Sequence, residues 1–451
     1  MIRKGIAKWI GYPLQDFYSG TEISKTQKFL EKSQHWNPEK MKIYREGKLQ
    51  SLISHAYSHV PYYRELFDGL NLKPEDIRSF DDLDKIPILT KEAARDNQKK
   101  LFSENIDLRK VKKGKTGGTT GVPLEFYKDR ADRSFAWGSY YRWYNWMGVD
   151  KGDKVVTVWG ASTHIKKSLQ NIKNNAVAWL QNSERINSYN LSERNLGDIY
   201  SEILKKDPVL IKGYLSTILF IANHIKANDL KPNKNLKAIS TTTETLLPVY
   251  RNLLEDVFRV PVYDQYGCGE VSAISYECSA HRGLHINEEH VHVEIVDEKN
   301  NSISEKTGRI IVTSLNNFAM PFIRYENGDT GSLLSKGCTC GVQSQLMGSV
   351  EGRVSDTIKL KNGNEVHGVY FTDIFFELGI TTDLMNRFQI VQRKSGSIDI
   401  LLEGKKGLNQ NHLDKIKKEV SNHVTINSIS VEDRLENDES GKFRYIKREY
   451  E

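Results

Sequence analysis

One stretch of the sequence combines glycine and threonine at a spacing that suits phosphate binding. Residues 115–123 read Lys-Thr-Gly-Gly-Thr-Thr-Gly-Val-Pro, with three glycines and three threonines among nine residues. Glycine adopts positive φ at little cost, so this loop can turn successive backbone N–H groups inward, and threonine hydroxyls add donors. A flexible surface turn would have a similar composition. Leu101-Phe102 before the loop and Leu124 to Tyr127 after it predict flanking strands.

Two other nucleotide-binding motifs are missing. Gly114-Lys115-Thr116 imitates the end of a Walker A loop, but Arg109 occupies the position where that motif requires a glycine. No G-x-G-x-x-G follows a predicted strand, so the sequence lacks the dinucleotide fingerprint as well. The glycine loop therefore needs support from the motifs that follow it.

Five short motifs follow the glycine loop in order. They are residues 240–244 (STTTE), 264–270 (DQYGCGE), 321–329 (PFIRYENGD), 352–359 (GRVSDTIK) and 439–444 (ESGKFR). A tyrosine such as Tyr266 can stack on a base, and a carboxylate such as Glu270 can reach a metal-bound phosphate. Asp329 lies on a predicted turn that suits hydrogen bonds with ribose hydroxyls. Each motif alone is typical of an ordinary turn, whereas six in this order are specific.

Together, the six motifs resemble those of the adenylate-forming superfamily, which includes acyl-CoA synthetases, luciferases and peptide-synthetase adenylation domains. The chain looks most like the phenylacetate–CoA ligase branch, particularly CapK-type proteins of capsular polysaccharide gene clusters. The Thr-Gly-Gly-Thr-Thr-Gly-x-Pro-Leu loop, the Lys-Gly-Tyr stretch at Lys212 and Gly283-Leu284-His285 fit that branch. The resemblance extends over residues 40–451 and is strongest from Gly114 onward.

The resemblance implies a two-step reaction. A small carboxylic acid attacks the α-phosphate of ATP, which gives an acyl-adenylate and pyrophosphate. A thiol such as that of coenzyme A, an amine or a hydroxyl then displaces AMP. This chemistry needs charge stabilisation more than covalent catalysis, so positioned donors, Mg²⁺ and a lysine are expected to promote it. Surface-polysaccharide biosynthesis is the expected context.

The resemblance also implies which residues hold the nucleotide. The residues that match the loop around the β- and γ-phosphates are Thr116, Gly117, Gly118, Thr119, Thr120 and Gly121. Glu244 matches a carboxylate near the adenine pocket, and Tyr266 matches the ring beside adenine. Asp329 matches the aspartate that binds both ribose hydroxyls, and Arg353 matches a further nucleotide contact.

Two residues are implied to be catalytic. Glu270 matches the carboxylate associated with Mg²⁺, and Lys442 matches the lysine that reaches the acyl and phosphate oxygens during adenylation. An ammonium group favours the negative charge that develops there. Asp356 matches the hinge about which a small domain would rotate to remove Lys442 for the second step. In isolation, Lys442 would be interpreted as a solvated lysine near the C-terminus.

The sequence departs from the wider superfamily at two places. Gly269 stands where threonine or serine usually precedes the glutamate, so one hydroxyl contact to phosphate is missing. Leu124-Glu125 follows the loop proline where many members carry a lysine, a feature shared with the phenylacetate–CoA ligase branch. The glycine leaves a second hypothesis open, in which the protein binds nucleotide but has lost catalysis and acts as an assembly partner in a polysaccharide complex.

Three of the four cysteines lie in two compact groups. Cys278-Ser-Ala-His281 and Cys338-Thr-Cys340 have chelating spacings, and three cysteines with one histidine form a structural zinc set. A zinc ion bound by Cys278, His281, Cys338 and Cys340 would join the two ends of a β-rich segment. His285 is a rival for the fourth ligand, and four reduced, unrelated thiols are the alternative to a metal site.

The elements around these motifs predict an α/β fold. Strands and helices alternate from Lys154 to Tyr263, two alternating strands follow at residues 291–296 and 308–313, and a last α+β pattern extends beyond Gly352. We expect a large N-terminal adenylate-forming domain over residues 1–352, with α/β subdomains and a β-rich subdomain. A small mobile C-terminal α+β domain over residues 353–451 would carry Lys442.

An aromatic helix and a turn are the expected acid pocket. The helix runs from Arg130 to Met147 and contains Trp, Tyr and Phe residues, which usually pack in a core but can also line an acyl or aryl pocket. The turn at residues 159–164 (WGASTH) follows a predicted strand. His164 at its end is expected to be structural rather than catalytic.

Composition sets the remaining expectations. The chain has 451 residues, 38% hydrophobic and 27% charged, and a net charge of +7. No apolar run approaches the roughly 18 residues of a membrane span, and the basic N-terminus lacks a signal peptide's apolar stretch. Lysine and glutamate are interspersed and no nucleic-acid motif is present, so the charge excess is interpreted as general surface charge. A cytoplasmic protein is expected, with a homodimer as the commonest assembly.

Overall fold

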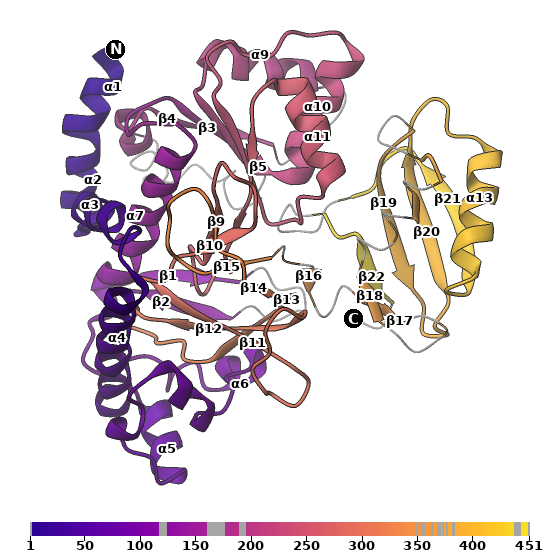
Figure 1. The fold of residues 1–451 in the computed structure, drawn as a ribbon. Helices are drawn as coiled ribbons and strands as arrows, with labels where there is room; N and C mark the ends of the chain where they lie inside the picture. The colour runs from indigo at the N-terminus through magenta and orange to yellow at the C-terminus, as the bar shows by residue number, and fades with distance from the viewer. Residues whose placement is uncertain are drawn as a thin grey trace.

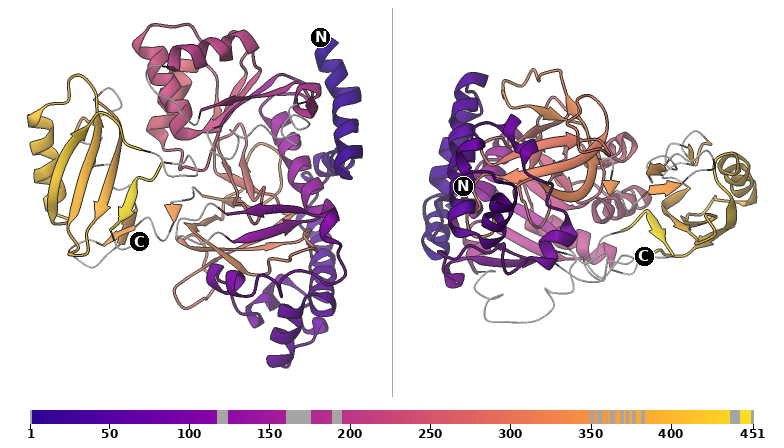
Figure 2. Two further views of the ribbon diagram at one scale, coloured as in Figure 1. Left: turned by 180° about the vertical axis from the view of Figure 1, so that it is seen from behind. Right: turned by 90° about the horizontal axis from the view of Figure 1, so that it is seen from below.

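The structure, a computed structural model, describes residues 2–116, 124–159, 176–188, 195–348, 350, 352–353, 357–359, 361, 365–367, 371, 374–375, 378–380, 384–436 and 443–449. Figure 1 shows a large body that contains the indigo, magenta and most of the orange elements, and a smaller, mostly yellow body beside it. The views from behind and from below in Figure 2 show the same separation. No helix in the described part of the chain is long and apolar enough to cross a membrane.

A parallel sheet lies in the upper half of the large body in Figure 1. Its strand order is β4-β3-β5-β6-β7. The strands are β3 (Val155–Trp159), β4 (Ser183–Asn187), β5 (Leu210–Tyr214), β6 (Ala238–Thr242) and β7 (Val262–Tyr263). One face packs on α9 (Leu196–Lys206), α10 (Leu215–Ala227) and α11 (Pro248–Phe258). The other face packs on α7 (Arg130–Trp146), so the sheet is buried on both sides, as is usual for parallel strands.

The predicted alternation of strands and helices is therefore present. The predicted helix Pro248–Phe258 has these bounds in the structure, with proline at its first position, where the missing N–H costs nothing. The predicted aromatic helix is α7. Strand β4 was not predicted, because Ser-Glu-Arg-Ile-Asn is a mostly polar segment at the edge of the sheet. Helix α9 was not predicted either, although its buried Leu196, Ile199, Tyr200 and Ile203 have helical spacing.

Two antiparallel sheets make the lower half β-rich. One has the order β11-β12-β13-β16 and contains β11 (Val291–Val296), β12 (Gly308–Ser314), β13 (Tyr325–Gly331) and β16 (Gly352–Arg353). The other contains β8 (Gln265–Tyr266), β9 (Ser275–Glu277), β10 (Leu284–Ile286), β14 (Leu333–Leu334) and β15 (Leu346–Met347). The predicted hairpin over residues 291–313 is β11 paired antiparallel with β12.

The N-terminal helical segments pack in two places, since those that carry Ala7, Tyr12 and Ile23 lie against α7 and the later ones lie on the β-rich half. They are α1 (Ile2–Ile6), η1 (Ala7–Gly11), α2 (Tyr12–Ser19), α3 (Ile23–Ser33), α4 (Pro38–His59), α5 (Pro61–Gly69), η2 (Pro74–Asp76), η3 (Phe80–Lys85), α6 (Lys91–Asp96) and η4 (Leu108–Lys110). Leu49, Leu52 and Phe67 of α4 and α5 share one hydrophobic core with the β11 and β12 side chains. This packing agrees with the predicted helical, peripheral character of residues 1–100.

The strand before the glycine loop is not the predicted one. Residues 101–102 lie in a turn, and Leu101 is buried in the core. The strand is β1 (Lys112–Lys115), which pairs antiparallel with β2 (Glu125–Lys128). Lys-Lys-Gly-Lys gives no apolar signal because β1 is largely exposed, so the pairing of β1 with β2 rather than its burial defines the strand.

The smaller body has its own hydrophobic core. The sheet order is β21-β20-β19-β22, with β19 (Met385–Gln392), β20 (Ile398–Gly404), β21 (Ile426–Glu432) and β22 (Ile446–Arg448). It is covered by α13 (Gln410–Ser421), and a small hairpin pairs β17 (Thr357–Lys359) with β18 (Glu365–His367). The predicted helix at residues 369–378 lies mostly outside the described residues, and the boundary at residue 353 stays a prediction.

A buried ion pair fixes α7 to the β-rich half. Arg142 Nη1 lies 2.9 Å from Glu289 Oε1, and their side chains are 3% and 2% exposed. Arg142 Nη2 donates to Asn287 Oδ1 at 2.8 Å, and Ser33 of α3 donates to Glu289 Oε1 at 2.5 Å. Since each charge has hydrogen-bonding partners, removal of one would leave the other unpaired in the core.

Replacement of this arginine by methionine tests the role of the ion pair. We expect Arg142→Met to lower the free energy of unfolding by about 3–5 kcal/mol, because Glu289 would remain buried without a counter-charge. The control is Arg130→Met on the same helix, whose pair with Glu22 is 60% and 51% exposed. That variant should lose at most about 1 kcal/mol. Equal losses in urea unfolding would contradict the assignment.

Candidate functional site

Tyr266 and Asp329 are in direct contact. The Tyr266 hydroxyl donates to Asp329 Oδ2 at 2.8 Å, and Asn327 Nδ2 donates to the same hydroxyl at 2.5 Å. Asp329 N donates to Asn327 Oδ1 at 3.1 Å, which holds the amide in this position. Tyr266 ends β8, and the two others lie on β13, so the pairing joins two sheets. The structure thus brings together two residues that the motifs place at adenine and ribose.

The backbone of Arg353 adjoins this pair. β13 and β16 are antiparallel, and their register places Asp329 opposite Arg353. Three of the predicted nucleotide contacts, separated by up to 87 positions in the sequence, therefore lie at one end of the β-rich half. An aromatic ring, a carboxylate and the backbone of a third predicted nucleotide contact therefore lie in a single region, and their roles in binding stay predictions.

Glu270 is buried beside these residues. It is 4% exposed, and its Oε1 accepts a hydrogen bond from Tyr325 OH at 2.7 Å. Tyr325 begins β13, the strand that also carries Asp329. A carboxylate held in this way is a suitable ligand for a hard cation such as Mg²⁺, because one oxygen is fixed and the group has a defined direction.

The ring of Phe126 explains the glycine before Glu270. A Cβ at Gly269 would lie 3.3 Å from Phe126 Cε1, and one at Gly114 would lie 2.3 Å from Cε2 of the same ring. Phe126 lies on β2, so its ring packs between the glycine-loop hairpin and the segment that carries Glu270. A hydroxyl-bearing residue at position 269 would compete with this ring for space.

The base of the glycine loop is closed by two hydrogen bonds. Thr116 N donates to Leu124 O, and Leu124 N donates to Thr116 Oγ1, each at 2.9 Å. The predicted phosphate-binding residues 117–121 lie outside the described residues, as do Lys442 and the predicted hinge Asp356. Thr116, at the top of the β1–β2 hairpin, is therefore the member of the predicted phosphate loop that the structure describes.

Glu244 contacts the start of α10. Its carboxylate accepts from Ser216 N at 2.6 Å and from Ser216 Oγ at 2.8 Å. Desolvation raises the pKa of Glu244, whereas the bonds from Ser216 and the backbone N–H of Phe443 lower it. Phe443 belongs to the small body and directly follows Lys442 in the sequence. Glu244 is therefore influenced by a residue of each body.

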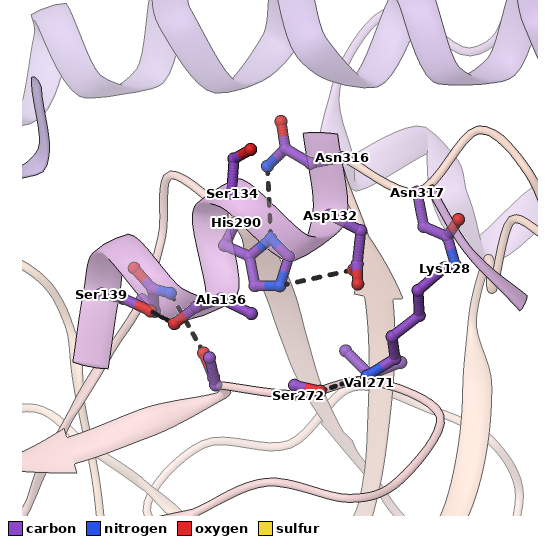
Figure 3. Close-up of polar contacts among 12 residues, drawn as sticks. Lys128, Asp132, Ser134, Ala136, Ser139, Val271, Ser272, His290, Asn316 and Asn317 are labelled. Atoms are coloured by element: carbon purple, nitrogen blue, oxygen red, sulfur yellow. Dashed lines mark hydrogen bonds and ion pairs between the residues drawn. The ribbon is translucent and has the colours of Figure 1, made fainter. Parts of the chain in front are cut away.

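A buried polar cluster holds the elements behind Glu270. Figure 3 shows Lys128 of β2 pointing toward Ser272, to which it donates a hydrogen bond. In the same view His290 lies between Asn316 and Asp132, with Nε2 3.7 Å from Asp132 Oδ1. Burial lowers the pKa of His290 to about 3, so the imidazole is neutral. The cluster fixes the first turn of α7 and the segment after Glu270.

The cysteines form one cluster with a histidine. Ligand atoms of Cys278, His285, Cys338 and Cys340 all lie within 4.8 Å of one another. Cys278 Sγ is 3.5 Å from Cys338 Sγ, and Cys340 Sγ is 3.2 Å from His285 Nε2. The other ring nitrogen of His285 lies 3.3 Å from Ser344 Oγ, a partner of the kind that orients metal-binding histidines.

The fourth member of the predicted zinc set needs correction. His281 is not in the cluster; its Nδ1 lies 3.2 Å from Glu277 Oε1 and 3.1 Å from Arg251 Nη1. The turn after Cys278 gives His281 a φ of +50°, which directs its ring away from the sulfurs. The antiparallel pairing of β9 with β10 brings His285 there instead. The chemistry of three thiols and an imidazole fits zinc, and the metal itself stays a prediction.

Sequence reasoning missed three residues of this region. Tyr325 and Asn327 lie inside the quoted motif at residues 321–329, and their hydrogen-bonding side chains beside the predicted aspartate were the available signal. Ser216, which binds Glu244, directly follows the first residue of α10, where side chains often bind a helix terminus. None of these contacts can be read from spacing alone.

Known proteins with related sequences carry two names, phenylacetate-coenzyme A ligase and CapK. Residues 358–449 match the family model of the CapK C-terminal domain. The phenylacetate-coenzyme A ligase of Thermus thermophilus is 26% identical over 393 residues, which are 80% of this chain and 80% of that protein. Protein CapK of Staphylococcus aureus is 27% identical over 292 residues, which are 63% of this chain and 62% of that protein.

Solved structures share the fold over nearly the whole chain. A 2-hydroxyisobutyryl-CoA ligase in the postadenylation state has a TM-score of 0.75 at 16% identity, covering 92% of this chain and 91% of that one. The same ligase in the thioesterification state has a TM-score of 0.61 at 18% identity, with the same coverage.

This chain has the fold of adenylate-forming acyl-CoA ligases, with an α/β large part and a CapK C-terminal domain. Its named relatives are phenylacetate-CoA ligases and CapK, which confirms the branch that the motifs predicted. These findings support an ATP-dependent, AMP-forming ligase. The roles of the individual site residues stay predictions.

Two matched histidine variants test the metal cluster. We expect purified protein to contain roughly one zinc ion per chain, and His285→Asn to lose most of it, because Nε2 would be replaced by a weak ligand. His281→Asn is the control and should keep its zinc. Zinc content would be measured by elemental mass spectrometry beside thermal unfolding. A fully folded wild type without metal, or loss of zinc in the control, would refute this ligand set.

Asp264 gives a prediction for the pH dependence of stability. Desolvation raises the pKa of Asp264 to about 8, and the charge of Glu277, whose Oε2 accepts from Asp264 N at 2.9 Å, adds to this. In the unfolded chain an aspartate has a pKa of about 3.9. Between these values the folded state binds more protons than the unfolded state, so this carboxyl makes stability fall as pH rises from about 4 to 8.

Asp264→Asn should remove that dependence. An asparagine can still accept the hydrogen bond that Gln265 N donates to Oδ1. The free energy of unfolding of the variant, relative to wild type, should therefore increase with pH by up to about 1.4 kcal/mol per unit in this window. Urea unfolding at pH 5, 6, 7 and 8 measures it. A difference that does not change with pH would show that the carboxyl is ionised in the folded protein.

Proposed function

We propose that this protein activates a small carboxylic acid with ATP, forming an acyl-adenylate and pyrophosphate, and then transfers the acyl group to an acceptor. The observation that carries the proposal is the hydrogen-bonded pair Tyr266–Asp329 next to Arg353. These residues occupy the motif positions that bind adenosine in adenylate-forming enzymes. The fold and the phenylacetate-CoA ligase relatives support the same reaction.

The described residues have different proposed roles in binding the nucleotide. Tyr266 offers a ring for the adenine base, and its hydroxyl holds Asp329 in place for the ribose hydroxyls. Glu270, whose carboxylate is fixed by Tyr325, would hold Mg²⁺ at the phosphates. A bound Mg²⁺ would neutralise phosphate charge and favour attack at the α-phosphorus. The hairpin β1–β2, which flanks the glycine loop in the sequence, packs its Phe126 ring close to Gly269.

Lys442 is the proposed catalytic residue of the first step. Its neighbour Phe443 lies against Glu244 at the strand ends of the large body. A lysine there would stabilise the charge on the acyl and phosphate oxygens as the acid attacks. Rotation of the small body would then withdraw the lysine and admit the acceptor.

The acceptor and the biological context are proposed from the relatives. The phenylacetate-coenzyme A ligases suggest the thiol of coenzyme A, and the CapK relative suggests a role in surface-polysaccharide biosynthesis, where an amine or hydroxyl of a sugar would be an alternative acceptor. The hypothesis of an inactive assembly partner depended on Gly269. The Phe126 ring gives that glycine a packing role, which leaves the hypothesis without specific support.

Pyrophosphate release tests the reaction and the lysine together. We expect Mg²⁺–ATP turnover that depends on one class within a panel of aryl, acyl and sugar acids. Lys442→Ala should lower that release by about 10²–10³-fold, the usual effect of removing one positioned charge donor. The control is Lys418→Ala on the exposed face of α13. Full activity of Lys442→Ala, or ATP binding without release for every acid, would refute the proposal.

A further inference from the structure

We propose that the acid carries a second anionic group, a distal carboxylate, and that Lys212 binds it on the α7 side of the parallel sheet. The inference rests on the proposed function for its reaction and goes further by naming the class of acid. Three independent features of the structure support it: the position of Lys212 in the sheet, its contacts, and an unpaired hydroxyl beside it.

Lys212 belongs to a polar row that crosses four strands. It lies at the centre of β5, in register with Thr157 of β3 and Ser240 of β6, and Thr157 is in register with Arg185 of β4. Side chains at one register position of a parallel sheet point to the same face. The row therefore places two cationic residues and two hydroxyls on one face of the sheet.

That face is the one covered by the aromatic helix α7. The residues two positions earlier on the same strands point the same way and pack in the α7 cluster; they are Val155, Leu210 and Ala238. Lys212 itself contacts α7, since its Nζ donates to Tyr144 OH at 2.7 Å. The polar row thus lies against the helix that was expected to line the acid pocket.

The polar row lies two residues before the ends of β5 and β6, and the nucleotide is proposed to bind at those strand ends. Tyr214 and Thr242, two residues further along β5 and β6, point to the same face and end their strands. Ser216 and Glu244 follow directly at the edge. Two strand residues span roughly 6.6 Å. An acid whose reacting carboxylate meets the nucleotide at the edge would extend its other end toward Lys212.

The charge of Lys212 lacks an acidic partner. Among the described residues, no carboxylate forms an ion pair with it. Its other neighbours are aromatic: Nζ lies 4.9 Å from the centre of the Tyr140 ring and 5.2 Å from that of Tyr144. Desolvation lowers the pKa of Lys212, whereas Tyr140 raises it and the positive charge of Arg185 lowers it. An unpaired ammonium in such surroundings is costly, and an anion from the substrate would relieve the cost.

Ser240 gives independent support for a ligand at this position. It is 1% exposed, and within the described part of the chain its Oγ has no hydrogen-bond partner. Buried hydroxyls are usually satisfied. Ser240 is the lateral neighbour of Lys212, so one carboxylate between them would accept from the hydroxyl and from the ammonium together. The Tyr144 hydroxyl accepts from Lys212 and can still donate its own proton, which gives the carboxylate a third hydrogen bond.

Matched acids test the inference. The pairs are hexanoate with adipate and phenylacetate with 4-carboxyphenylacetate, and each pair differs by one distal carboxylate. 4-Sulfophenylacetate separates a need for carboxylate geometry from a need for negative charge. Two readouts are used on the full chain: kcat/KM for pyrophosphate release, and the dissociation constant of each acid by calorimetry with a nonhydrolysable ATP analogue.

The variants are Lys212→Met, which keeps the length of the side chain and removes the charge, and Lys205→Met on the exposed surface of α9 as control. We expect wild type to prefer the diacid of at least one pair. Lys212→Met should weaken that diacid by about 10- to 100-fold, the effect of one lost charge-assisted hydrogen bond, and leave the matched monoacid unchanged or improved. Lys212→Arg should restore part of the preference, and thermal unfolding checks that each variant folds.

The outcomes separate this inference from the proposed function. Turnover of monoacids without any preference for diacids would overturn the inference and leave the function intact. Binding of a diacid that depends on Lys212, without pyrophosphate release, would support the site and refute the reaction. Equal losses for both members of a pair in Lys212→Met would make the lysine structural and overturn the inference, as would the absence of binding for every diacid.

Discussion

The parallel pairing of β4, β3, β5, β6 and β7 is the constraint on which the site depends. Parallel strands end at a common edge, so residues that follow β5 and β6 meet there although they are far apart in the sequence. This is why Ser216 binds Glu244, and why both lie above Lys212 and Ser240. Antiparallel pairing of any one of these strands would send its polar ending to the opposite edge of the sheet.

A second constraint acts on the residue before Glu270. The aromatic ring of Phe126 fills the space between the glycine-loop hairpin and the segment of Glu270, and the absence of a Cβ at Gly269 permits this contact. A hydroxyl at that position would add a phosphate contact, whereas the ring fixes two loops relative to each other. A side chain at position 269 would require the ring to move by a few tenths of an ångström, so the glycine favours close packing and does not by itself indicate lost catalysis.

The fold could be predicted where burial and local chemistry agree. Helix α11 begins at Pro248 and carries an apolar face, β11 alternates between apolar and polar residues, and β12 contains a buried β-branched run, so all three were predicted within a residue or two. The strand β1 could not be, because Lys-Lys-Gly-Lys is exposed and only its pairing with β2 makes it a strand. Motifs identified Tyr266 and Asp329, since each lies in a characteristic string, but their hydrogen bond depends on two sheets meeting.

The fourth residue of the metal cluster likewise could not be identified from sequence spacing. Cys278-x-x-His281 has a chelating spacing, and spacing carries no information about φ. The turn at His281 sends its ring to Glu277 and Arg251, while the β9–β10 pairing returns the chain so that His285 reaches the sulfurs. Ligand choice is therefore decided by strand register, a property of the folded sheet. Register likewise joins Lys212 to Ser240 across β5 and β6, and the two residues are 28 positions apart in the sequence. Chemistry-bearing residues in this chain were recognisable by type, and it is the pairing of strands that decides which of them act together.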